Sequence, residues 1–197
     1  MSRETDEWEA QEERRIGSHL GYLDRFSKQN LSEFLQQQQR SLEYPALLDY
    51  IYDIALVFYY QGKYDEAMRW YERALAGYEK ALGKDHQSTL DTVHNIAMVF
   101  QNQGKYDEAM RWSERALAGH EKVLGKDHPS TLDTVHNIAV VFDSQGKYDE
   151  AMRWYERALA GKEKALGKDH PSTLDTVHNI ALVFDGQGKY DEAMRWY

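Results

Sequence analysis

The 197-residue sequence contains no cysteine, which excludes disulfide bonds and thiolate chemistry and favours a reducing, cytoplasmic location. Its longest apolar run, 54–60, is far shorter than the roughly 20 residues of a membrane span, and its acidic start is unlike a secretory signal. Positive charge is scarce, because 24 Lys and Arg face 33 Asp and Glu. The net charge of −9 argues against a nucleic-acid partner. With only three prolines, we expect an acidic, mostly helical protein.

The string QGKYDEAMRW occurs four times, at intervals of 42 residues. Aligned on this string, residues 88–129 and 130–171 are identical at 36 of 42 positions. Residues 46–87 match 130–171 at 31 of 42 positions, and 172–197 match 130–155 at 24 of 26. This period predicts an array over 46–197, made of units 46–87, 88–129 and 130–171 and a shortened unit 172–197.

Each unit is predicted to form two helices. In the third unit we expect Ser130 and Thr131 to open the first helix, since hydroxyl side chains favour helix starts. Gly146 then ends this helix, because glycine readily adopts the left-handed conformation of a helix end. The second helix is expected from Tyr148 to Leu166. One such hairpin cannot bury its apolar stripe alone, but stacked copies can.

The last unit contains the pattern Ile180-Ala181 … Phe184 … Gly188-Lys189-Tyr190 … Ala193 … Tyr197, which resembles the tetratricopeptide repeat. The 42-residue length and the linker 166–171 make it similar to the kinesin light chain type, which also occurs in the repeat arrays of fungal and bacterial NLR-like receptors. The resemblance covers 46–197. It implies an all-α solenoid, a right-handed superhelix whose first helices line a concave peptide-binding groove.

Residues 1–45 do not follow the period. An apolar face at helical spacing and Asn30 followed by Glu33 predict two helices in this segment. We interpret them as an N-terminal cap for the first repeat, because solenoid ends need capping. The alternative is the edge of a neighbouring domain.

Three histidines recur at one place in each first helix, with an Asp three residues before and an Asn directly after: His94, His136 and His178. Asp and His at this spacing share a helix face, as metal ligands can. However, successive copies lie one repeat apart, too far to share one ion. We expect instead a hydrogen-bonded ladder of Asp, His and Asn between neighbouring repeats.

The other polar motifs do not indicate catalysis. The loop pairs 85–86, 127–128 and 169–170 are Asp-His, which we expect to cap helix ends. The tryptophans at 70, 112, 154 and 196 are expected to pack between repeats. Phosphate loops, nucleophile elbows and zinc spacings are absent from the sequence. We therefore expect no enzyme, no cofactor and no metal site.

Between the second, third and fourth units the first helix differs at only three places: Met98/Val140/Leu182, Gln101/Asp143/Asp185 and Asn102/Ser144/Gly186. By the family pattern the first two places face the groove and the third lies at its rim. We interpret this as a binding surface varied copy by copy over a fixed frame. Neutral drift at exposed positions is the alternative.

The resemblance and these patterns together define an expected groove. Its residues are Asp49, Tyr52, Tyr59, Tyr60, Asp91, His94, Asn95, Met98, Gln101, Asn102, Asp133, His136, Asn137, Val140, Asp143, Asp175, His178, Asn179, Leu182 and Asp185. The Asp rows favour a partner peptide or protein with basic residues, and the family uses Asn at the positions of Asn95, Asn137 and Asn179 to hold a ligand backbone. The three tyrosines are expected to be a binding hot spot. The alternative is that residues 31–42 cover them as part of the cap.

The fourth unit has a much shorter second helix than the others, and we expect its apolar surface to be covered by another chain. The predicted homo-oligomer, most simply a dimer, includes these residues in its contact: Val177, Ile180, Phe184, Met194 and Trp196. Fraying of this end without association is the alternative. A self-assembling structural array without a separate ligand is the second hypothesis for function.

Overall fold

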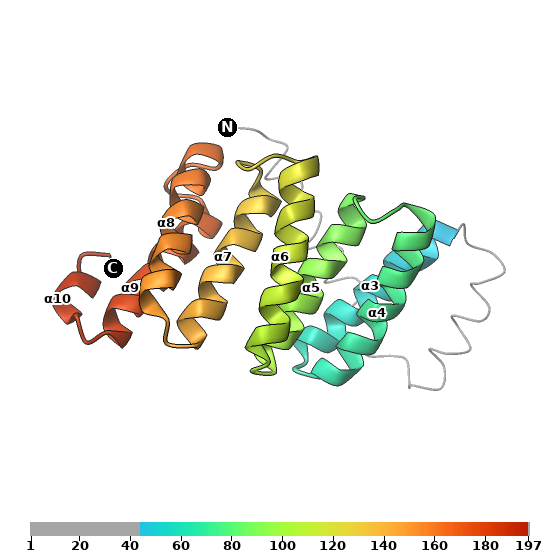
Figure 1. Ribbon diagram of the computed structural model, residues 1–197, viewed down its shortest axis with the longest axis horizontal. Coiled ribbons are helices and arrows are strands. Elements are labelled where there is room, and N and C mark those ends of the chain that lie inside the picture. Colours follow the sequence, from blue (N-terminus) through green and yellow to red (C-terminus); the bar gives the residue numbers. More distant parts are fainter. Residues whose placement is uncertain (1–43, 197) are drawn as a thin grey trace. The chain divides into compact units, whose positions relative to one another are not determined.

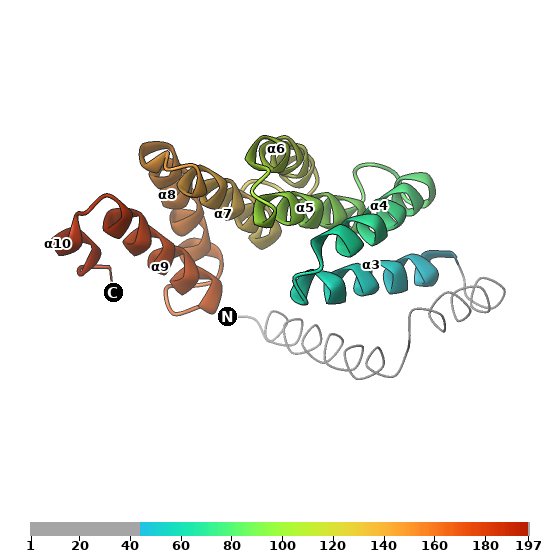
Figure 2. The same ribbon diagram turned by 90° about the horizontal axis from the view of Figure 1, so that it is seen from below.

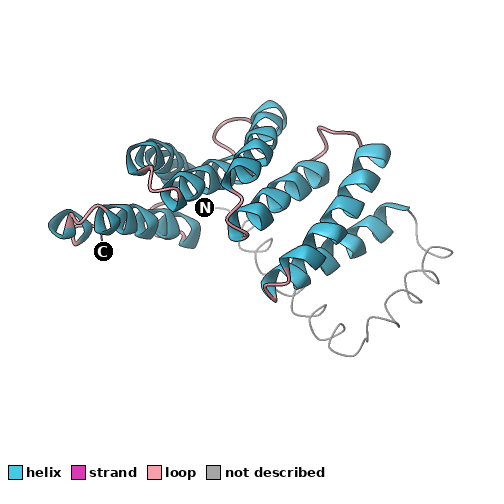
Figure 3. Ribbon diagram, turned by 60° about the horizontal axis from the view of Figure 1, so that its bottom comes forward, coloured by secondary structure: helices cyan, strands magenta, loops and turns pink. Residues whose placement is uncertain are grey.

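The structure is a computed structural model that describes residues 44–196, with side chains from residue 47. This part of the chain consists of helices joined by short loops (Figure 3). The helices are α3 (Tyr44–Tyr60), α4 (Tyr64–Ala81), α5 (Gln87–Asn102), α6 (Tyr106–Val123), α7 (Pro129–Ser144), α8 (Tyr148–Ala165), α9 (Pro171–Gly186) and α10 (Tyr190–Ala193). The predicted N-terminal cap, residues 1–45, lies outside the described residues except for its last two, which begin α3.

The chain divides into two compact units, residues 1–83 and 84–197. In the first unit α3 and α4 pack as a hairpin (Figure 2). In the second unit α5 pairs with α6 and α7 with α8, while α6 packs on α7 and α8 on α9 (Figure 1). The first helices also contact one another, α5 with α7 and α7 with α9. The expected all-α array of stacked hairpins is confirmed, and within the second unit it gives neighbouring first helices a common face.

The first helices begin one residue earlier than predicted. In the third repeat α7 starts at Pro129, and the preceding residue, His128, is its N-cap. The backbone N–H of Ser130 donates to His128 Nδ1 at 3.2 Å, and His86 and His170 cap their helices in the same way. The imidazole nitrogen therefore accepts the N-cap hydrogen bond that a hydroxyl or carboxylate oxygen usually accepts at this position. Proline follows because the first helical residue has no intrahelical use for its N–H.

The aspartates of the loop pairs join consecutive repeats rather than cap a helix. The ammonium of Lys164 lies 2.6 Å from Asp127, and that of Lys122 lies 2.6 Å from Asp85. The pKa of Asp127 is lowered by this hydrogen bond and charge. Both pairs are exposed, so each contributes little to stability. The capping prediction is thus confirmed for the histidines and wrong for these two aspartates.

Glycine and alanine set how closely the two helices of a repeat approach. Alanines 139, 151 and 158 are completely buried, as small interface residues should be. A Cβ at Gly161 would lie 2.3 Å from Cδ2 of Leu132, a fully buried side chain of α7, and Gly119 has the same relation to Leu90. The side chain of the first helix therefore fills the space that a second-helix Cβ would take.

The apolar stripes of these helices are too short and too interrupted by charge for a bilayer. In the described part of the chain, none of the helices has the length and apolar character that crossing a membrane would require.

Candidate functional site

A row of polar contacts crosses the face formed by the first helices α5, α7 and α9, called here the first-helix face. His94 Nδ1 lies 3.1 Å from Thr134 Oγ1, and the Asn137 amide nitrogen lies 2.9 Å from His94 Nε2. The Thr134 hydroxyl already donates to the Ser130 carbonyl at 3.0 Å, so it must accept from His94. His94 is therefore the neutral tautomer with its proton on Nδ1 and its Nε2 lone pair facing the amide.

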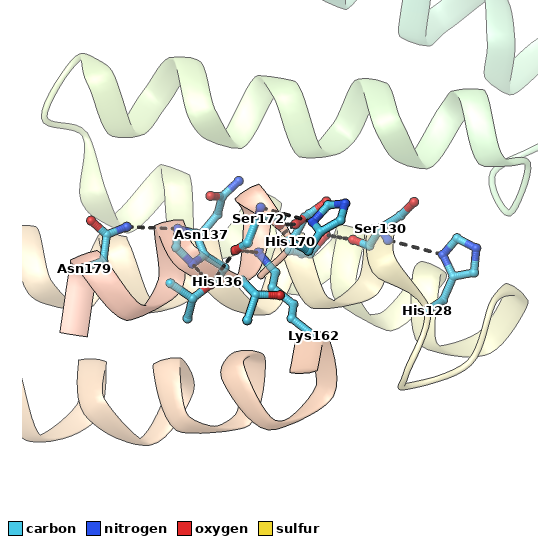
Figure 4. Close-up of polar contacts among 12 residues, drawn as sticks. His128, Ser130, His136, Asn137, Lys162, His170, Ser172 and Asn179 are labelled. Carbon is cyan, nitrogen blue, oxygen red and sulfur yellow. Dashed lines mark hydrogen bonds and ion pairs between the residues drawn. The ribbon is translucent and has the colours of Figure 1, made fainter. Parts of the chain in front are cut away.

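The next repeat contains the same arrangement (Figure 4). His136 Nδ1 lies 3.0 Å from Thr176 Oγ1, and the Asn179 amide nitrogen lies 3.1 Å from His136 Nε2. Burial lowers the pKa of His136 to about 4, and the ammonium of Lys162 adds to this effect. Burial also lowers the pKa of His94. The predicted ladder between repeats is confirmed for histidine and asparagine, with threonine as its third member.

We expect the free energy of unfolding to fall as the pH drops from 6.5 to 4. The folded pKa of His136 lies below the value of an unfolded histidine, so the folded chain binds fewer protons in this window and is destabilised by acid. The loss due to His136 is at most about 3 kcal/mol, and His94 acts in the same direction. Urea unfolding across this range measures the loss. In a His136→Gln variant the pH dependence should be weaker, and an unchanged slope would contradict the assignment.

Asp133 joins neighbouring repeats as predicted, but its partners are Lys162 and Ser172 rather than a histidine or an asparagine of the ladder. Asp133 Oδ1 lies 2.9 Å from the ammonium of Lys162 and 3.2 Å from the Ser172 hydroxyl. Burial pushes the pKa of Asp133 upward, but Lys162 pushes it further down, so the net shift is downward. The carboxylate of Asp133 thus contacts both the second helix of its own repeat and the next first helix, α9. The ladder histidine His94 instead meets a threonine and an asparagine of the following first helix, α7.

Sequence reasoning missed the second-helix residues that meet these aspartates. His120 Nε2 lies 3.3 Å from Asp91 Oδ1, and in the first unit the Tyr78 hydroxyl donates to Asp49 Oδ1 at 2.5 Å. A signal was present in the sequence. Tyr78, His120 and Lys162 occupy equivalent positions, and this is the one place in the second helix where all three complete copies differ.

The predicted groove residues of the second unit are all at least partly exposed on the first-helix face. Met98 and Val140 are partly buried, and Leu182 is 41 % exposed, so these three give the face an apolar ridge. Asp185 is exposed, and partial burial raises the pKa of Asp143. The face therefore combines an apolar row, a carboxylate row and the histidine–asparagine ladder.

The predicted tyrosine hot spot lies in the first unit. The rings of Tyr59 and Tyr60 meet edge to face with centroids 5.5 Å apart, and Tyr60 is 64 % exposed. Tyr52 meets the buried Tyr71 of α4 in an edge contact at 5.7 Å. Tyr59 also lies 5.9 Å from Tyr64. The exposed aromatic surface thus centres on Tyr59 and Tyr60, and its role in binding stays a prediction.

Three of the predicted self-association residues pack against other residues of this chain. Ile180 is completely buried, and Phe184 and Trp196 pack against the cluster that includes Tyr155 of α8. The prediction that Ile180 is uncovered is wrong, because α9 packs on α8. Phe184 and Trp196 are partly buried, and their part in a contact between chains stays a prediction. The exposed large apolar residues of this end are Leu174, Leu182, Tyr190 and Met194, and of these Met194 belongs to the predicted contact. Val177 is partly buried and Met194 is 72 % exposed. Association of two chains through this end stays a prediction, with the exposed apolar residues as the expected contact.

The polar groups of this face do not converge on a point. Among the described residues there is no group of three or more His, Cys, Asp or Glu side chains that could hold a metal ion. The ladder instead extends along the array, one rung per repeat, which suits an extended ligand better than a compact one.

Solved structures with this architecture were compared with the chain. A crystal structure of kinesin light chain-type, nearly identical TPR-like repeats from Podosopora anserina is 28 % identical, with a TM-score of 0.65, covering 84 % of this chain and 80 % of that chain. BtubC (BKLC) from P. vanneervenii is 23 % identical, with a TM-score of 0.71 and coverage of 84 % and 66 %. The Rap conjugation gene regulator of plasmid pLS20, in complex with the Phr* peptide, is 18 % identical, with a TM-score of 0.71 and coverage of 84 % and 44 %. The last two show the fold alone.

Family models give the same result from the sequence. Models of the tetratricopeptide repeat match residues 47–88, 88–164 and 154–197. A search of curated protein sequences finds no match. The repeat period, the stacked helix hairpins and these matches agree over most of the chain, and the protein belongs to the tetratricopeptide repeat family, with kinesin light chain-like repeats.

Proposed function

We propose that the first-helix face of α5, α7 and α9 binds an extended peptide segment of a partner protein that carries basic and apolar side chains. The observation that supports this best is the location of the differences between copies. Among the second, third and fourth copies, residues 88–102, 130–144 and 172–186 differ only at three positions, whose side chains are partly or fully exposed, while the buried positions are identical. A binding surface that is tuned over a constant frame would have this pattern.

The chemistry of the face indicates the kind of peptide. The ridge of Met98, Val140 and Leu182 offers apolar contact, and Asp143 and Asp185 offer negative charge one helical turn further along. The amide oxygens of Asn137 and Asn179 are candidates to accept backbone N–H groups, because their nitrogens already face histidines. An extended peptide with alternating basic and apolar residues complements this pattern.

The family supports a role in interaction. Tetratricopeptide repeats are generally interaction modules, and the Rap regulator was solved with a peptide bound. The rows along α5, α7 and α9 carry no convergent set of acid, base and nucleophile. The proposed activity is therefore the capture of a partner, with no chemical step.

Binding of a basic peptide should weaken as salt concentration rises. As probe we suggest an acetylated peptide of alternating Lys and Leu, the lysine peptide, with a control in which every Lys is acetyl-lysine, the acetyl-lysine peptide. Raising the ionic strength shortens the Debye length below roughly 8 Å and screens the carboxylates. Asp143→Asn and Asp185→Asn should each weaken binding of the lysine peptide about two- to fivefold, as measured by isothermal titration calorimetry.

The control for these substitutions is Asp127→Asn, which removes a carboxylate from a loop rather than from the first-helix face. It should leave the affinity for the lysine peptide unchanged. If wild-type protein binds the lysine and acetyl-lysine peptides equally well, or if salt has no effect, the acidic face does not recognise a basic ligand.

A further inference from the structure

The second helices contain one buried position whose chemistry changes in every complete copy. Residues 64–81 and 148–165 are otherwise identical, yet this position is Tyr78 in one and Lys162 in the other. In α6 it is His120. The side chains of His120 and Lys162 are only 1 % and 2 % exposed. Three such different side chains at one buried place indicate that packing alone does not decide the residue.

Each of these side chains meets an aspartate of the first helix in its own repeat, and for His120 and Lys162 that aspartate belongs to the first-helix face. The closest atoms are Lys162 Nζ and Asp133 Oδ1, at 2.9 Å, and His120 Nε2 and Asp91 Oδ1, at 3.3 Å. The aspartate side chains remain 50 % and 38 % exposed. A carboxylate in this position is contacted from inside the repeat by the buried residue, and it is open to a ligand from outside.

Lys162 and Tyr78 differ in the net charge that remains at the aspartate each one contacts. Lys162 carries a full positive charge and lies in contact with Asp133, so that pair is close to neutral as seen from outside. Tyr78 donates a hydrogen bond to Asp49 but brings no charge. Burial raises the pKa of Tyr78, so its hydroxyl stays neutral and Asp49 keeps its full negative charge.

His120 is the third case. Its Nδ1 lies 3.1 Å from Thr134 Oγ1, and because that hydroxyl donates to Ser130, it accepts from His120. The proton of a neutral His120 is therefore on Nδ1, and Nε2 faces Asp91 without a hydrogen-bond partner. A neutral imidazole leaves the charge of Asp91 in place, whereas an imidazolium cancels it.

We propose that the buried second-helix residue at this position sets the charge that the first-helix face presents to its ligand, through Asp133 for Lys162 and through Asp91 for His120. This inference rests on the proposed function, since it assumes that a peptide binds the face. The buried residues are positioning residues, because they touch the carboxylates and not the ligand. The array then varies its charge along the groove without changing an exposed residue.

The test exchanges residues between copies of the repeat. Lys162→Tyr introduces the residue of the first copy and should raise the affinity for the lysine peptide about two- to fivefold. His120→Lys introduces the residue of the third copy and should lower that affinity by a similar factor. The acetyl-lysine peptide should bind both variants as it binds wild-type protein. Thermal unfolding followed by circular dichroism confirms that each variant is folded, and Lys162→His replaces Lys162→Tyr if the latter is not.

The possible results separate this inference from the proposed function. If a substitution changes the affinity for both peptides by the same factor, the buried residue acts only through packing and the inference is wrong. If wild-type protein prefers the lysine peptide but neither substitution changes that preference, the proposed function stands and the inference fails. If wild-type protein binds neither peptide, both fail.

Discussion

Replacing Tyr155 with serine should lower the free energy of unfolding by about 3–5 kcal/mol, the usual cost of removing a buried aromatic side chain. Tyr155 of α8 is completely buried and packs with Ala139, Ala151, Ile180 and Val183 at the junction between the third and fourth repeats. Its ring also meets His136 edge to face, with centroids 5.4 Å apart. Removal of the ring leaves a cavity between three helices. Urea unfolding monitored by circular dichroism measures the loss.

The matched control is Tyr155→Phe. The Tyr155 hydroxyl is buried and has no hydrogen-bond partner, so its removal should leave stability within about 1 kcal/mol of wild type or increase it. The second repeat has Ser113 at the equivalent position, although the buried residues that correspond to the neighbours of Tyr155 are the same there: Ala97, Ala109, Ile138 and Val141. A Phe variant as unstable as the Ser variant would mean that the hydroxyl, and not the ring, holds this junction.

Helix positions in this protein could be predicted from the sequence because the period gives four readings of one pattern. Glycines such as Gly146, with a φ of 71°, end each first helix where the turn was expected. The helix start was predicted less accurately. Ser130 has the residue type of an N-cap, but His128 caps the helix, and the competition between a hydroxyl and an imidazole two residues earlier is decided by backbone geometry.

The candidate site was predicted only where contacts follow from helix periodicity. The repeat spacing was enough to expect that His94 and Asn137 of successive first helices meet, and they do. The partner of Asp133 depends on how the second helix is set against the first, which helix periodicity does not determine. The same register places Gly161 against Leu132. The burial of Ile180 depends on which side of α9 packs against α8. Because α9 has apolar residues on more than one side, the sequence alone does not show which side that is.

Replacing Asp133 with alanine should lower the free energy of unfolding by about 3 kcal/mol, because it leaves the buried ammonium of Lys162 without its counter-charge. The ammonium would retain the Ser172 carbonyl, at 3.3 Å, as a hydrogen-bond acceptor. Lys162→Met should cost less, since Asp133 is half exposed and can be hydrated. In the double variant the loss caused by Asp133→Ala should largely disappear. A double-mutant cycle in urea unfolding should therefore give a coupling of about 2 kcal/mol.

The chain provides its own comparison for this cycle in Asp91→Ala. The partner of Asp91 is the imidazole of His120, a side chain that a folded protein can bury as a neutral ring, whereas the partner of Asp133 is the ammonium of Lys162. Asp91→Ala should therefore be less destabilising than Asp133→Ala at neutral pH, although both aspartates occupy the same place in the repeat. Equal losses would mean that the packing around the aspartate, and not the charge behind it, determines its contribution.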